Sequence, residues 1–167
     1  MKSVIVAALT LTLLVGGQGE SHQVGTRQTH LRTAGATSAN RGPCDARWFV
    51  NIKPTLGHDI VVRRVQNLIR CAVRVWSVSG GVEKALAVAD CESHFWPWAT
   101  NGSSKGVYQH IETYWIGRVR AYLRPGWFWQ LRDDDLSTWP GIFQARANVL
   151  VSIRMAHVGG WGPWSCA

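Results

Sequence analysis

The residue best suited to chemistry in this chain is Glu92, which lies between Cys91 and Ser93 at the end of an apolar helical pattern. With 3.6 residues per turn, Glu92 shares a helix face with Ala85 and Val88. Burial against apolar side chains disfavours a carboxylate anion, and so does the negative end of the helix dipole. We therefore expect Glu92 to hold a proton that it can donate, which is the chemistry needed to break a glycosidic bond.

Helix spacing alone supports a second interpretation equally well, in which Glu92 is an exposed residue at a frayed helix end. The other acidic residues compete weakly for a catalytic role. Asp90 is expected to point away from the Glu92 face, and the aspartates at 133–135 are typical of a solvated loop or a helix cap. Glu112, beside a predicted aromatic surface, is the nearby alternative acid. No second carboxylate stands at the spacing that a nucleophile would need.

Helices are the elements that must position Glu92, because apolar residues recur at helical spacing while no convincing alternating strand is present. Asp59 is expected to cap the first helix. Stretches rich in glycine, proline and polar residues predict loops at 97–106 and 127–141, with room for a short β-hairpin around 97–108. The fold class is therefore mainly α. The four predicted helices cover residues 59–78, 82–93, 108–123 and 143–157.

The segment 1–19 has the features of a secretory signal peptide: Lys2, an apolar run of roughly a dozen residues and then small residues. The run is shorter than the ~20 residues that span a bilayer, although a short membrane anchor is the alternative. Cleavage after Gly17 or Gly19 would release a secreted protein. Residues 20–43 are polar and typical of a flexible linker, so the folded domain is expected to span 44–167.

Export makes the four cysteines, at positions 44, 71, 91 and 166, interpretable. An even number in an oxidising compartment indicates two disulfides, and three pairings are open. A zinc site is disfavoured, because no two cysteines lie a few residues apart and no histidine pair has ligand spacing. We expect neither a metal nor a cofactor.

The chain is basic, with 18 Lys and Arg against 10 Asp and Glu and a net charge of +8. Loss of Lys2 with the signal peptide leaves 17 basic residues and a charge of +7. Such a charge attracts polyanions, among them a bacterial wall, anionic lipid or nucleic acid, and it also fits an ordinary basic secreted protein. A nucleic-acid partner rests on charge alone and disagrees with export. We expect a monomer without stable membrane insertion.

Three motifs carry a family resemblance. The first is Cys-Glu-Ser-x-Phe-x-Pro-x-Ala-x-Asn at 91–101, and the second is Ser-x-Gly-Val-Tyr-Gln-x-x-x-Thr-x-Trp at 104–115. Together they resemble the soluble lytic transglycosylase group of the lysozyme-like superfamily. The third, Gly-Trp-Gly-Pro-Trp-Ser-Cys at 160–166, is similar to the end of the resuscitation-promoting factor branch.

The resemblance implies a small lysozyme-like, goose-type-like domain that cleaves peptidoglycan between N-acetylmuramic acid and N-acetylglucosamine. Glu92 would act as the acid and then as the base, and Gly106 would let backbone approach the sugar. The resemblance favours a Cys91–Cys166 bridge, which leaves Cys44–Cys71. The residues that it implies for binding substrate or orienting Glu92 are Ser93, Gly106, Tyr108, Gln109, Asn148 and Trp161.

One departure from the family pattern lies at 157–160, where His-Val-Gly-Gly stands in place of an Ala-Tyr-Asn-like motif. Trp161 would fill the place of that tyrosine. Aromatic faces stack on sugar rings, although most tryptophans belong to the core, and we expect only two or three to touch sugar. The candidates for a glycan cleft are Trp96, Trp98, Trp127, Trp129 and Trp161.

A single carboxylate implies a mechanism in which the N-acetyl group of the substrate assists. Capture of the sugar by its own 6-hydroxyl would make the protein a lytic transglycosylase, and capture by water would make it a muramidase, a hydrolase. A non-catalytic module that binds peptidoglycan is the alternative from another class.

Overall fold

The computed structural model describes residues 42–124, 126–127 and 139–167. The predicted signal peptide 1–19, nearly all of the predicted linker 20–43, Trp129 and the aspartates at 133–135 lie outside these residues. Within the described ranges, no helix is both long enough and apolar enough to cross a membrane.

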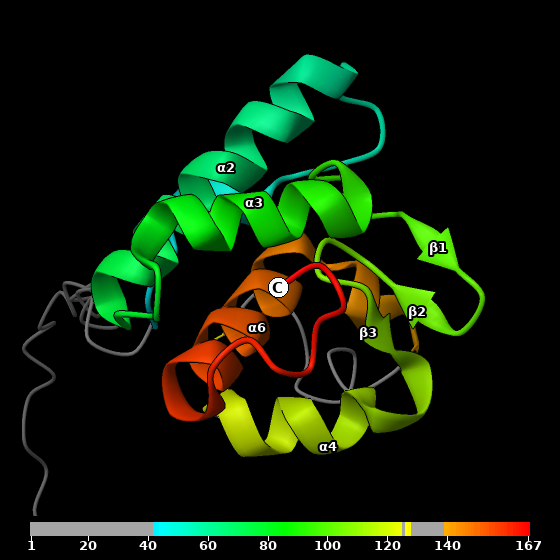
Figure 1. Cartoon of the computed structure of the whole chain (residues 1–167). Coiled ribbons are helices and arrows are strands. Elements are labelled where there is room, and N and C mark those ends of the chain that lie inside the picture. Colours follow the sequence, from blue (N-terminus) through cyan, green and yellow to red (C-terminus); the bar gives the residue numbers. More distant parts are fainter. Residues whose placement is uncertain (1–41, 125, 128–138) are drawn as a thin grey trace, which may run out of the picture. The chain divides into compact units, whose positions relative to one another are not determined.

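The described part is mainly helical, as the sequence predicts, with a small antiparallel sheet between the third and fourth helices. Figure 1 shows these elements along the chain. The helices are α1 (Arg47–Val50), α2 (His58–Val75), α3 (Gly81–Ser93), α4 (Glu112–Tyr122), the 3-10 helix η2 (Trp139–Phe143) and α6 (Ala145–Gly159).

Helix α2 forms because its apolar residues recur every three or four positions and lie on one face. The predicted boundaries need correction. Gly57 is the N-cap and Asp59 lies within the first turn, where its charge suits the helix dipole without capping it. The helix ends at Val75 because the backbone of Trp76 turns to an extended conformation. The fully buried residues of α2 are Val61, Val65, Leu68, Ile69 and Ala72.

Helix α6 is the central element of the core. Its residues are buried on every side from Ala145 to Ala156 except at Arg154, as is typical of a helix enclosed by its neighbours. It packs against α1, α2, α4 and η2. In Figure 1, α6 (orange) lies between α3 and α4. It begins two residues later than predicted, because Trp139–Phe143 forms a separate 3-10 turn.

The sheet consists of β1 (Thr100–Asn101), β2 (Ser104–Lys105) and β3 (His110–Ile111), paired in that order. The hairpin expected around 97–108 is confirmed, with Thr100 opposite Lys105. Strand β3 occupies residues that the sequence predicts as helical, so the prediction of a helix from residue 108 is wrong. The backbone of Gln109 has a φ of 46°, which no helix accepts, and α4 begins at Glu112.

Two disulfides join distant segments, and their pairing is the one that the family resemblance implies. Cys44–Cys71 links the segment before α1 to α2. Cys91–Cys166 links the last turn of α3 to the C-terminal segment after α6, across a sequence separation of 75. The second bridge therefore fixes the segment 161–166 beside Glu92.

Candidate functional site

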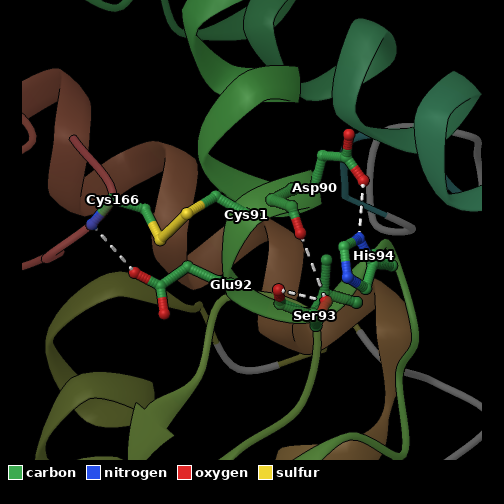
Figure 2. The surroundings of a disulfide bond; sticks show 8 residues. Asp90, Cys91, Glu92, Ser93, His94 and Cys166 are labelled. Carbon is green, nitrogen blue, oxygen red and sulfur yellow. Dashed lines mark hydrogen bonds and ion pairs between the residues drawn. A yellow bond between two sulfur atoms is a disulfide. The ribbon is translucent and has the colours of Figure 1, made fainter.

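Glu92 lies in the last turn of α3 and is half-buried. Its Oε1 accepts a hydrogen bond from the backbone amide of Cys166 at 3.4 Å. Figure 2 shows the Glu92 side chain reaching toward Cys166, while Asp90 and His94 pair on the other side of the helix end. The buried residue one turn after Ala89 is Ser93, so Glu92 lies at the edge of the buried face rather than within it.

The hydroxyl of Ser93 fastens the end of α3 to the turn that follows β2. Ser93 is buried, and its Oγ donates to the carbonyl of Val107 at 2.7 Å, with the Ala89 carbonyl at 3.3 Å. Because a serine hydroxyl has one hydrogen, the shorter contact takes it. Ser93 therefore holds the backbone beside Glu92, and its hydroxyl is not free for substrate. Its role in orienting Glu92 stays a prediction.

Gly106 opens that turn, and no other residue fits its position. Its φ is 81°, a conformation that side chains rarely adopt. A Cβ atom would lie 2.2 Å from Nδ2 of Asn148 and 2.7 Å from the carbonyl oxygen of Ile142. The close approach that requires glycine is thus to α6 and η2 in the core, not to a sugar.

Asn148 is fully buried and links three backbone segments. Its Oδ1 accepts from the amide of Tyr108 at 3.0 Å. Its Nδ2 donates to the carbonyls of Ile142 at 2.9 Å and Lys105 at 3.4 Å. The family resemblance implies that this residue binds substrate, but with no exposed surface it supports the turn from behind.

Tyr108 and Trp161, both predicted to bind substrate, belong to the core. Tyr108 is 0% exposed, its hydroxyl donates to the Ala85 carbonyl at 2.9 Å, and burial raises its pKa well above the usual value. Trp161 is 7% exposed, stacks on Tyr108, and donates its Nε1–H to the Ser79 carbonyl. Trp164 packs with these two rings and donates its Nε1–H to the Tyr108 carbonyl. Rings packed in this way have no free face for a sugar.

Gln109 is the predicted substrate residue that keeps an unused polar group. It is half-buried, and its Nε2 donates to the carbonyls of Gly106 at 2.7 Å and Ala99 at 3.2 Å. Its Oε1 is the one buried side-chain nitrogen or oxygen in the described ranges without a hydrogen-bond partner. A buried acceptor without a donor is destabilising by about 1–3 kcal/mol. With less than 1 Å² exposed, this oxygen lies behind the surface that a ligand could touch.

Trp96 and Trp98 keep partly exposed surface directly after the end of α3. Their rings meet edge to face at 5.1 Å, and the ring of His58 stacks on Trp96 at 5.2 Å. Trp127, half-buried, packs on Trp76. Trp96 and Trp98 are therefore the aromatic residues near Glu92 in sequence that retain area for a ligand.

The other predicted acids contribute nothing to this site. Asp90 is exposed, as expected, and pairs with His94 at 3.1 Å. Glu112 is exposed at the start of α4. Across the ranges that the structure describes, no three His, Cys, Asp or Glu side chains gather in a way that could hold a metal ion.

Comparisons with protein-family models, with curated proteins and with solved structures gave no match. The resemblance carried by the three motifs therefore stays a prediction.

Two of the groups that contact Glu92 and Ser93 belong to the backbone and cannot be predicted from residue types. The amide of Cys166 and the carbonyl of Val107 are backbone groups, so no residue type announces them. Trp164 belongs to the terminal motif, but nothing in that motif predicts its contact with Tyr108.

Proposed function

We propose that the protein cleaves the glycan strand of peptidoglycan between N-acetylmuramic acid and N-acetylglucosamine, with Glu92 as the acid and then the base. The observation that carries the proposal is the setting of this carboxylate. It is half-buried and accepts a long hydrogen bond of 3.4 Å from a backbone amide, and the next residue is hydrogen-bonded to the Gly106–Gln109 turn.

The surroundings of Glu92 suit proton transfer better than those of the other half-buried carboxylate in the described ranges, Asp45. The charge of Asp45 acts on the buried guanidinium of Arg146, where burial lowers the arginine pKa to about 10. Glu92 forms no ion pair with any described residue. A carboxylate without a cation partner can change its protonation state during a reaction without breaking a salt bridge.

The hydrogen bond from the Cys166 amide gives the two oxygens of Glu92 different roles. Oε1 accepts the amide hydrogen, so Oε2 is the oxygen that carries the transferable proton. In the first step that proton passes to the glycosidic oxygen as the bond to the muramic sugar breaks. In the second step the carboxylate takes a proton from the hydroxyl that captures the sugar, and the amide stabilises the anion between the steps.

A single carboxylate fits assistance by the N-acetyl group of the substrate, followed by capture by the muramic 6-hydroxyl. In this scheme Trp96 and Trp98, which keep partly exposed surface, offer aromatic area on which a sugar ring can stack. Secretion belongs to the same proposal, because two disulfides are typical of proteins in oxidising compartments.

The test compares the wild type with Glu92→Gln on purified sacculi. General acid catalysis contributes about 10²–10⁴-fold, so we expect the variant to lose at least about 100-fold in lysis and to keep its binding in a pull-down. Glu112→Gln, an exposed glutamate at the start of α4, is the matched control and should lyse like the wild type. Lysis by the Glu92 variant at the wild-type rate would show the assignment to be wrong.

Two further results separate the alternatives. Mass spectrometry of the products distinguishes a 1,6-anhydro end, which the transglycosylase reaction leaves, from the reducing end of a muramidase product. A wild-type protein that binds sacculi without any lysis would instead be a non-catalytic binding module.

A further inference from the structure

A buried histidine outside the residues discussed so far joins β3, α4 and α6. His110 is 1% exposed and packs against the rings of Trp115 and Trp164. One of its nitrogens meets Arg118 of α4, and the other meets Ser152 of α6. A polar ring held in the core from both sides fixes the strand on which it lies.

The directions of these hydrogen bonds follow from the chemistry of the partners. Nη1 of Arg118 lies 2.7 Å from Nδ1 of His110, and a guanidinium can only donate, so Nδ1 is the acceptor. The ring hydrogen is therefore on Nε2, which donates to Oγ of Ser152 at 2.8 Å. The Ser152 hydroxyl in turn donates to the Asn148 carbonyl at 2.7 Å.

The end of this directed chain is the residue that supports the turn beside Glu92. Asn148 holds the Tyr108 amide, and His110 itself directly follows Gln109. Gln109 has a φ of 46°, which persists in a residue other than glycine only when the surroundings enforce it. The His110 ring anchors the backbone immediately after that strained residue.

We propose that His110 is a positioning residue: with its hydrogen directed to Ser152 by Arg118, it holds Gln109 in its positive-φ conformation and so sets the place of the Gly106–Gln109 turn relative to Glu92. The effect on catalysis rests on the function proposed above. The effect of His110 on the conformation of Gln109 does not depend on that function.

The neutral ring is maintained by its surroundings. Burial, and then the charge of Arg118, lower the pKa of His110 to about 3. The groups that face the ring are Arg118 from α4, Ser152 and the backbone of Asn148 from α6, and the indoles of Trp115 and Trp164. No carboxylate of the described residues is among them.

Two substitutions of His110 each keep one of the two hydrogen bonds that its ring nitrogens form. In His110→Gln the amide nitrogen takes the place of Nε2 and can still donate to Ser152. In His110→Asn the amide takes the place of Nδ1, so Arg118 keeps an acceptor while Ser152 loses its donor. We expect kcat on purified peptidoglycan to fall at least about tenfold in the Asn variant and KM to stay within about twofold, because misplaced reacting groups lower kcat. The Gln variant should recover most of that loss.

Ser152→Ala removes the same contact from the other side, so it should resemble His110→Asn, and the double variant should be no slower than either single variant. His157→Asn is the matched control, because His157 is an exposed histidine at the end of α6 whose ring contacts the Ser77 carbonyl. A crystal structure of His110→Asn gives a readout independent of activity: we expect the Gln109 φ to leave the left-handed region.

If His110→Asn lowers the melting temperature but keeps the wild-type kcat and the Gln109 φ, His110 is merely structural and the proposal is overturned. An inactive wild type would refute the proposed function instead, and the Gln109 φ in the variant would then decide whether the positioning is real.

Discussion

The backbone amide of Cys166 donates a hydrogen bond to Oε1 of Glu92 across a sequence separation of 74 residues. The contact is long, at 3.4 Å, so by itself it is weak. The adjacent Cys91–Cys166 bridge keeps its donor in place. The carboxylate proposed to carry the chemistry thus depends on a segment that follows the last helix.

Removing each disulfide should affect stability and activity differently. By loop-closure entropy, the Cys91–Cys166 bridge contributes about 4.5 kcal/mol and the Cys44–Cys71 bridge about 3.5 kcal/mol to the free energy of unfolding. Paired Cys→Ala variants should therefore both lower the melting temperature, with the larger drop for loss of Cys91–Cys166. Only loss of Cys91–Cys166 should lower lysis by folded protein, measured well below both transitions. Equal activity in the two variants would contradict a role for the bridge at the site.

Gly106 and Asn148 should be energetically coupled. Gly106→Ala should destabilise by about 3 kcal/mol or more, from its positive φ and from the contact of the new Cβ with Asn148. Asn148→Ala should cost a similar amount by leaving the Tyr108 amide and the Ile142 carbonyl unpaired. Urea unfolding of the double variant should show a loss at least about 1 kcal/mol smaller than the sum, because the side chain that the Cβ meets is absent. Strict additivity would contradict the packing described here.

Tyr108→Phe tests whether that tyrosine supports the core or touches substrate. Loss of the hydrogen bond to the Ala85 carbonyl should reduce the free energy of unfolding by about 1 kcal/mol. KM should stay within twofold of the wild type, because the ring has no exposed surface. A several-fold rise in KM with unchanged stability would show instead that Tyr108 binds substrate.

His110 should make stability depend on pH in a defined window. Its pKa is lowered from 6.5 in the unfolded chain to about 3 in the folded protein, so between these values the unfolded state binds more protons. The free energy of unfolding therefore falls as pH drops from 6.5 toward 3, by up to about 1.4 kcal/mol per pH unit from this group. Urea unfolding between pH 4 and 7 should give a shallower slope for His110→Gln than for the wild type. Parallel slopes would mean that the buried histidine does not titrate in this way.

Local periodicity was enough to predict the helices that carry the site. The helix predicted at 59–78 is present as α2, and Val61, Val65, Leu68 and Ala72 on its apolar face are fully buried. Val75 lies within the predicted range but is 48% exposed, because the helix ends there. The spacing of apolar residues predicts which face of a helix is buried. It does not predict where the helix ends, because that depends on where the chain must turn.

The role of polar residues could not be predicted from spacing. Asn148 lies in the middle of an apolar helix, and such a residue can face a cleft or satisfy buried backbone equally well. Its partner, the Tyr108 amide, is 40 residues away and belongs to a turn whose shape depends on Gly106. The residues near Glu92 could therefore be predicted from the sequence. Whether each of them supports the backbone or could touch substrate required the tertiary structure.

The bridge between Cys91 and Cys166 also has a consequence for the order in which the protein matures. Synthesis and export proceed from the N-terminus, so Glu92 emerges well before the segment 161–166. During that interval the carboxylate lacks its amide partner, and the end of α3 lacks its covalent tether. The candidate site is thus completed only after Cys166 is oxidised. Under the proposed function, the activity would stay incomplete until the chain has reached an oxidising compartment.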